Sequence, residues 1–305
     1  MRRHALIFLL LAALGGCGGS GSEQDESSTD LYAYDTSKPL EYRDAGVVNH
    51  GYPIAIHDVS YAGPDGERVA ALLAVPPGNG PYPGVVYLHG AGQDRQAMLL
   101  PATWLAGRRA VTLSVSSPFT RPEGQIAARG IEGVRGERNL TILGVKELRR
   151  AVDLLQSLPQ VDDEHIGFLG FSAGARTGAL LAGVEHRLKA VVLMSGGETT
   201  VDQVLQAVDR RDREKLRPLF EDTDGLAYIA RSSPTKLLFQ AGREDEIVPR
   251  DALQRLYRAA GKPKEIRWYD GGHDLPLQAY RDHLAWLQQA LSLQGPPVPG
   301  ASAGP

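Results

Sequence analysis

The chain has 305 residues, of which 42% are hydrophobic and 23% charged, as in a globular protein with one large or two small domains. The net charge of −3 provides no basic surface for nucleic acid, so a nucleic-acid-binding protein is not expected. A single cysteine excludes a disulfide-stabilised scaffold. The long apolar run, residues 5–14, is too short to cross a bilayer, which excludes a multi-span membrane protein.

The N-terminus has the organisation of an export signal, because two arginines precede the apolar run and small residues follow it. Its end, Leu14-Gly-Gly-Cys17, resembles the lipobox of bacterial lipoproteins. That resemblance implies a signal peptide over 1–16, acylation of Cys17 and a lipid anchor on the membrane of the bacterial cell envelope. The alternative is an ordinary signal peptide cut a few residues further on, which releases a secreted protein without Cys17.

Composition divides the remainder of the chain into three parts. Residues 18–30, GGSGSEQDESSTD, lack apolar side chains and predict a flexible tether over 17–49. The folded domain is expected over 50–294. The Pro/Gly/Ala-rich end, 295–305, predicts a disordered tail.

Within the domain, β-like runs alternate with helical stretches. The first two runs flank the turn sequence Gly63-Pro-Asp-Gly66 and predict a hairpin. The later runs are continuously apolar, as expected for strands covered on both faces. We therefore expect an α/β fold with a mostly parallel sheet and helices on both sides. The expected strands are 54–61, 69–75, 84–88, 110–115, 166–169, 190–194, 236–240 and 265–269.

Two helical stretches carry clear apolar stripes. Val145, Leu148, Val152 and Leu155 form one stripe at helical spacing. The other stripe comprises Leu277, Tyr280, Leu284, Leu287 and Leu291. In sheets of this kind ligands bind beyond the carboxyl ends of the strands, so chemistry is expected in the segments that follow the strands.

A G-x-S-x-G motif, Gly170-Phe-Ser172-Ala-Gly174, follows the run 166–169 and precedes a helical stretch. A sharp strand-to-helix turn needs small residues beside the serine, and it lifts the hydroxyl clear of the sheet. Ser172 is therefore the candidate nucleophile, and the Ala173 N–H at the helix start is a candidate oxyanion donor. The alternative is a glycine-rich turn with no catalytic role.

A serine nucleophile needs a general base, and His273 in Gly271-Gly-His273 fits that role best. It follows the last expected strand, and glycines before it allow the loop to approach the serine. Apart from His89, the other histidines lie in the signal, before the parallel strands, at strand entrances or inside the last helix.

The acid that orients the histidine should follow a strand between Ser172 and His273. Three neighbours after the run 236–240 compete for this role, Glu244, Asp245 and Glu246. The order serine, acid, histidine is that of the α/β hydrolases.

The second oxyanion donor should come from the loop His89-Gly-Ala91-Gly92, directly after the run 84–88. Its glycines let a backbone N–H approach a substrate carbonyl, and we expect the Ala91 N–H, with Gly92 as the alternative. His89 is interpreted as a structural histidine.

With these motifs the sequence resembles the α/β-hydrolase superfamily over roughly residues 55–292. The dienelactone-hydrolase-like and acyl-esterase (prolyl-oligopeptidase-like) branch is the most similar, and its pattern Gly-x-x-Asp-x-x-Val-Pro favours Asp245 as the acid. The resemblance implies a Ser172–His273–Asp245 triad with Ala91 and Ala173 as oxyanion donors. Dienelactone hydrolases carry a cysteine nucleophile, so Ser172 favours an ester substrate instead.

The segment 197–233 is longer than a simple strand connection and is expected to form a small helical cap over the site. Phe220 and Tyr228 are candidate lining residues of the substrate pocket, but the sequence alone does not place them there. The alternative is a surface insertion packed elsewhere. Arg121 and Arg138 are interpreted as solvated loop charges.

No His, Cys, Asp or Glu cluster has the spacing of a metal site, so neither a metal nor a cofactor is expected.

The sequence thus predicts a serine carboxylesterase that acts on a small-molecule ester through an acyl-enzyme intermediate. A peptidase of the prolyl-oligopeptidase type has the same constellation but usually an additional propeller. A dehalogenase would need an aspartate in place of Ser172. The third alternative is an inactive hydrolase fold used as a binding module.

Overall fold

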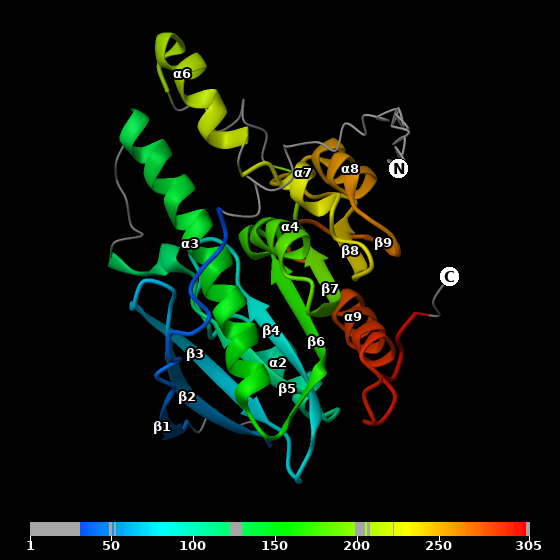
Figure 1. Cartoon of the computed structure of the whole chain (residues 1–305). Coiled ribbons are helices and arrows are strands. Elements are labelled where there is room, and N and C mark those ends of the chain that lie inside the picture. The colour runs from blue at the N-terminus through cyan, green and yellow to red at the C-terminus, as the bar shows by residue number, and fades with distance from the viewer. Residues whose placement is uncertain are drawn as a thin grey trace, which may run out of the picture.

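The computed structural model describes residues 31–48, 51, 53–122, 130–198, 205, 208–221 and 223–302. A nine-stranded sheet lies at the centre of this part of the protein, with its strands in the order β1-β2-β3-β5-β4-β6-β7-β8-β9 (Figure 1). The first three strands pair antiparallel, β3 pairs antiparallel with β5, and every later pair is parallel. The predicted signal peptide and Cys17 lie outside the described residues.

All eight expected strands are present, and one strand more. They are β2 (Ala55–Ala62), β3 (Arg68–Val75), β4 (Tyr82–Leu88), β5 (Val111–Val115), β6 (Val161–Phe171), β7 (Leu188–Met194), β8 (Lys236–Gly242) and β9 (Lys264–Tyr269). The additional strand is β1 (Arg43–Val47) at the edge of the sheet.

Helices cover both faces of the sheet, as predicted. One face carries α3 (Gly130–Ser157), α4 (Ala173–Val184), α7 (Gly225–Ile229) and α8 (Arg250–Ala259), and the other carries α2 (Leu99–Ala106) and α9 (Leu277–Ala290). A short 3₁₀ turn, η1 (Pro118–Thr120), follows β5, and α6 (Arg210–Glu221) contacts α3. This arrangement is the α/β-hydrolase fold.

Successive residues of β4 pack into cores on opposite sides of the sheet, which explains its continuously apolar sequence. Val86 and Leu88 pack into the core on the α3 and α4 side, and Val85 and Tyr87 pack into the core under α2 and α9. Successive strand residues point to opposite faces, so a strand covered on both sides needs apolar residues at every position.

The folded domain begins earlier than predicted. Tyr32 is fully buried and packs edge-to-face on Tyr228, with 5.1 Å between ring centroids. The Tyr34 hydroxyl donates to the Asp153 carboxylate at 2.9 Å, and β1 pairs with β2. The predicted tether over 17–49 is therefore wrong for residues 31–48, which belong to the domain.

The C-terminal boundary is also wrong for residues 295–302, because α9 binds this segment. The Ser302 N–H donates to the Asp282 carboxylate at 2.7 Å, and the Gln278 side-chain amide donates to the Gly300 carbonyl at 2.8 Å. Gln288 does the same for the Gly295 carbonyl at 2.7 Å. Residues 303–305 lie outside the described residues.

A buried histidine gives the fold a specific acid sensitivity. His283 is fully buried in α9, its Nδ1 donates to Gln240 Oε1 at 3.1 Å, and among the described residues its Nε2 has no partner. Burial lowers the pKa of His283 from 6.5 to about 3. The unfolded chain therefore binds a proton here before the folded chain does.

Stability should accordingly fall as the pH drops below 6.5, and His283 alone should contribute a loss of about 2 kcal/mol at pH 5. Urea unfolding of the wild type and of His283→Gln at pH 7 and pH 5 tests this expectation. The variant, which cannot titrate here, should lose less stability between the two pH values. Equal losses in both proteins would contradict the role given to His283.

Candidate active site

Ser172 lies in the turn between β6 and α4, with a φ of +53° and a ψ of −112°. A positive φ is strained for a residue with a Cβ, so the surroundings must hold it. Part of that support is the hydrogen bond from the Ser172 N–H to the Met194 carbonyl at 2.8 Å. The turn places the side chain at the carboxyl edge of the sheet.

The two glycines of the motif allow segments to approach closely. A Cβ on Gly174 would collide with the carbonyl oxygens of Leu88 and His89 at the end of β4. A Cβ on Gly170 would collide with the backbone of Gly174 on the other side of the turn. Both positions therefore need glycine for packing, and α4 begins directly against the end of β4.

His273 lies beside the serine, and its Nε2 is 2.9 Å from Ser172 Oγ. The loop that carries it contacts the end of β8, where a Cβ on Gly242 would collide with the Gly272 carbonyl. Ser195, after β7, donates its hydroxyl to the His273 carbonyl at 2.7 Å. Ser195 was not among the residues predicted for the site, because its only signal in the sequence is its position directly after a parallel strand.

Asp245 completes the arrangement on the other side of the imidazole. Its carboxylate oxygens lie 2.9 Å and 3.2 Å from His273 Nδ1, and it accepts the backbone N–H groups of Ile247 and Val248 at 2.9 Å. Its side chain is 6% exposed, whereas Glu244 and Glu246 are exposed. Of the three competing acids, the structure brings only Asp245 to the histidine.

These contacts fix the direction of the hydrogen bonds. An ionised carboxylate only accepts, so His273 carries its proton on Nδ1 and its Nε2 is free to accept from the Ser172 hydroxyl. A serine hydroxyl bonded to a neutral imidazole, which is oriented by a carboxylate, can form an alkoxide-like nucleophile.

The loop after β4 lies next to this arrangement and is cross-braced by side chains. His89 Nδ1 lies 2.8 Å from the Gly90 carbonyl, and the Ser117 N–H donates to His89 Nε2 at 3.0 Å. Gln93 accepts the Gly90 N–H at 3.0 Å. Burial lowers the pKa of His89, which keeps the ring neutral. These bonds support the interpretation of His89 as a structural residue.

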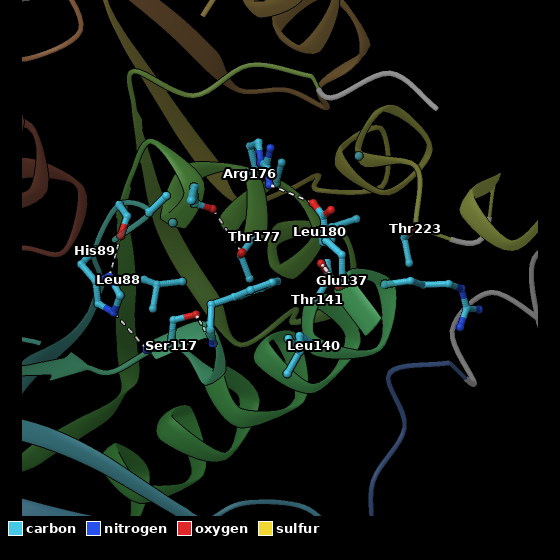
Figure 2. A pocket seen from close by; sticks show the side chains of 18 of the residues that line it. Leu88, His89, Ser117, Glu137, Leu140, Thr141, Arg176, Thr177, Leu180 and Thr223 are labelled. Carbon is cyan, nitrogen blue, oxygen red and sulfur yellow. Dashed lines mark hydrogen bonds and ion pairs between the residues drawn. The ribbon is translucent and has the colours of Figure 1, made fainter. Parts of the chain in front are cut away.

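A cavity of about 1250 Å³ extends from this loop, and both Ala91 and Ala173 line it. Apolar side chains from β4, α3, α4 and α6 form part of its wall, and Figure 2 shows several of them. Its volume exceeds the usual 300–1,000 Å³ of small-molecule pockets, so an occupant larger than an acetyl group fits. The described lining residues include four acids, Asp94, Glu137, Glu198 and Asp224, and two arginines, Arg138 and Arg176.

The segment 197–233 contributes to this cavity. Phe220 of α6 lines it, whereas Tyr228 of α7 is buried in the main core against Tyr32. Leu205, Val208, Leu216 and Phe220 pack with Val134 of α3. The described part of the segment thus packs against the N-terminal half of α3 at the cavity.

Two charged residues differ from their interpretation as solvated loop charges. Arg121 pairs with the buried carboxylate of Glu147 at 2.6 Å. Arg138 is half-buried, lines the cavity and donates to the Leu219 carbonyl at 2.5 Å.

Among the described residues, no group of three His, Cys, Asp or Glu side chains is arranged to bind a metal ion, and none of the helices has both the length and the apolar character of a membrane span.

Comparisons with known proteins agree with the fold. The model of the serine hydrolase (FSH1) family matches residues 137–283. Among solved structures, the acetyl xylan esterase from Paenibacillus sp. R4 superimposes with a TM-score of 0.70 at 20% identity, over 87% of this chain and 92% of that one. A puromycin-hydrolysing peptidase of Mycobacterium tuberculosis gives a TM-score of 0.64 at 19% identity, over 84% of this chain and 42% of that one.

Curated relatives include acyl-coenzyme A thioesterases. The chain is 27% identical to acyl-coenzyme A thioesterase 3 of Mus musculus, over 68% of this chain and 51% of that protein. It is 26% identical to the mitochondrial acyl-coenzyme A thioesterase 2 of Rattus norvegicus, over 77% and 55%. The chain therefore spans about half the length of the curated relatives that it matches.

Proposed function

We propose that this chain, which has the α/β-hydrolase fold and resembles serine hydrolases, hydrolyses carboxylic esters through an acyl enzyme on Ser172. The observation that carries the proposal is the continuous hydrogen-bonded line from Asp245 through His273 to Ser172 Oγ. An inactive binding module would not need a strained serine held at the end of such a line.

The proposed reaction has two steps that use the same groups. Ser172 Oγ attacks the carbonyl carbon while its proton moves to His273 Nε2, and Asp245 stabilises the imidazolium that forms. The Ala91 and Ala173 N–H groups stabilise the oxyanion, and His273 then gives the proton to the leaving alcohol. Water attacks the acyl-serine in the second step, with His273 as the base, and releases the acid.

A thioester is the second candidate substrate, because the curated relatives are named as acyl-coenzyme A thioesterases. The cavity gives this candidate less support than a neutral ester. Its described lining carries more acidic than basic side chains, and coenzyme A carries several phosphates that basic side chains would have to neutralise. A peptidase activity, suggested by one structural neighbour, is the third candidate.

A substrate panel tests the proposal and separates the candidates. The p-nitrophenyl esters of acetate, butyrate and octanoate, acetyl- and octanoyl-coenzyme A, and an amino-acid p-nitroanilide would be assayed with the same preparation. We expect the esters to have the highest kcat/KM. A higher kcat/KM for the coenzyme A thioesters would favour the second candidate, and no turnover of any substrate would contradict a hydrolase.

We also propose export and lipid attachment at Cys17, on the strength of the lipobox-like sequence alone. Acyl chains contribute about 0.8 kcal/mol for each buried CH₂ group, so several chains hold a protein on a membrane. Cys17→Ser should move the protein from the membrane fraction to the soluble fraction after expression in a bacterial host. An unchanged distribution would contradict the anchor, and Ser157→Ala is a suitable control because its hydroxyl donates to the Leu154 carbonyl within α3.

A further inference from the structure

A buried carboxylate lies on α3 outside the proposed reaction. The side chain of Glu147 is 1% exposed, and its Oε2 lies 2.6 Å from Nη2 of Arg121, whose side chain is 20% exposed. Removing two charges from water costs free energy, so a hydrophobic pair of similar volume often stabilises a fold better. The contribution of the pair to stability therefore does not account for its presence, and we consider which parts of the structure its position connects.

Arg121 belongs to the turn that lines the cavity beside the site. The Arg121 N–H donates to the Pro118 carbonyl at 3.2 Å, and Thr120 donates its N–H to the Ser117 carbonyl at 3.0 Å. A Cβ on Gly144 of α3 would lie 3.5 Å from the Pro118 ring, so the helix packs closely on the turn. Residues 117–121 are thus attached to α3 at two points, by packing at Pro118 and by the ion pair at Arg121.

The same turn supports the loop after β4. The Ser117 N–H donates to His89 Nε2 at 3.0 Å, and Figure 2 shows this bond beside the cavity. Because Nε2 accepts, His89 carries its proton on Nδ1 and donates it to the Gly90 carbonyl at 2.8 Å. Ala91, whose N–H is the proposed oxyanion donor, is the next residue. A continuous series of bonds therefore joins Glu147 to this donor.

The groups around the Glu147 carboxyl set its protonation. Burial raises the pKa of Glu147 to about 8, Arg121 opposes that increase, and the nearby Glu67 carboxylate adds to it. The Tyr61 hydroxyl donates to the backbone carbonyl of Glu147, so it does not occupy the carboxyl group, whose side-chain partners are Arg121 and Glu67. Arg121 is thus the group that favours the charged form of Glu147, and the loss of either partner removes the attachment of the turn.

We propose that Glu147 is a positioning residue, which holds the Ala91 N–H in place through Arg121, the 117–121 turn and His89. This inference rests on the proposed function, in which that N–H stabilises the oxyanion. A donor of this kind acts mainly in the transition state, so its displacement lowers kcat and leaves KM nearly unchanged.

Glu147→Gln and Glu185→Gln form a matched pair of variants. Glu185 is also a buried carboxylate, 2% exposed and paired with Arg187 at 2.5 Å, but it precedes β7 and so lies at the opposite edge of the sheet. We expect Glu147→Gln to lower kcat about tenfold and to leave KM within about twofold. The expected loss is smaller than the roughly 100- to 1,000-fold loss caused by removing one oxyanion donor, because the Ala91 N–H is displaced rather than removed. Glu185→Gln should change kcat less than about twofold, although both variants lose stability. Equal effects of the two variants on kcat would overturn the proposal.

A double-mutant cycle with His89→Gln tests the route. In the His89→Gln background, Glu147→Gln should lower kcat less than about twofold further, because the connection is already broken. Multiplicative losses in the double variant would show that Glu147 acts independently of His89 and would overturn the proposed route. Arg121→Lys, which keeps the charge but not the planar fork, should retain more activity than Arg121→Gln.

Hydrogen exchange gives a readout that does not depend on the substrate. Peptides that contain residues 89–93 should exchange faster in Glu147→Gln than in the wild type and in Glu185→Gln, even if every ester assay fails. Faster exchange together with no hydrolysis would contradict only the proposed function, whereas unchanged exchange would overturn the positioning role. If Glu147→Gln does not fold, Arg121→Gln at the partly exposed end of the pair takes its place.

Discussion

Ser172→Ala is expected to lower kcat for p-nitrophenyl esters by about 10⁶-fold, because nucleophile, base and acid act as one unit and the loss of the nucleophile removes the covalent route. KM should change little, since the cavity and the oxyanion donors remain. Steady-state kinetics with wild type purified in parallel provide the measurement, and thermal unfolding checks that the fold is intact.

The matched control for this variant is Ser157→Ala at the end of α3, where the hydroxyl donates to the Leu154 carbonyl at 2.7 Å. That change removes the same atom from a site remote from the carboxyl edge and should leave kcat within about twofold. A Ser172→Ala protein that keeps more than a tenth of the wild-type kcat would show that another group is the nucleophile.

Asp245→Asn should lower kcat by about 10⁴-fold. An asparagine amide can turn its NH₂ toward His273 Nδ1, which then accepts, and the imidazole proton moves to Nε2. In that tautomer Nε2 cannot accept the Ser172 proton, although the heavy atoms stay in place. The expected loss therefore comes from the position of a proton rather than from a change in packing.

Two neighbours of Asp245 serve as controls for charge. Glu244→Gln and Glu246→Gln each remove one negative charge within a residue of Asp245, and both side chains are exposed. Kinetics for the three variants should show about twofold effects for the two glutamates. A larger loss in either glutamate variant than in Asp245→Asn would mean that a different acid orients the histidine.

Continuous apolar runs predicted the parallel strands because burial on both faces imposes such runs on the sequence. β1 was not predicted, because burial imposes no apolar run on its sequence. Its sequence, Arg43-Asp-Ala-Gly-Val47, is exposed at every position, so it lies in the sheet through backbone pairing that leaves no apolar signal. Leu277, the first residue of the apolar stripe predicted for α9, is 49% exposed. The helical spacing of apolar residues therefore predicts the buried face of a helix more reliably than it predicts where that face ends.

The two boundary errors share a physical cause. Composition predicted flexibility for residues 31–48 and 295–302, but a few anchoring contacts are sufficient to order a polar segment. Tyr32 enters the core at one end, and the side chains of Gln278, Asp282 and Gln288 bind backbone groups at the other. Anchors of this kind depend on what the fold places beside the segment, and they have no local signature.

The candidate site was partly predictable because its principal residues follow strands in a known order. The structure brings Ser172, His273 and Asp245 together, and it places Ala91 and Ala173 at one cavity. Ser195 and the Arg121–Glu147 pair were missed. Arg121 and Glu147 are 26 residues apart on different elements, so only the packing of α3 on the turn reveals that they meet.

The most direct measurement of the central claim is the reaction of the full chain with a fluorophosphonate, followed by intact-mass analysis and peptide mapping. One phosphonyl group per chain is expected, located on Ser172, with labelling abolished in Ser172→Ala and slowed strongly in Asp245→Asn. A wild-type chain that stays unmodified, or one that carries the label on another residue, would contradict the central claim.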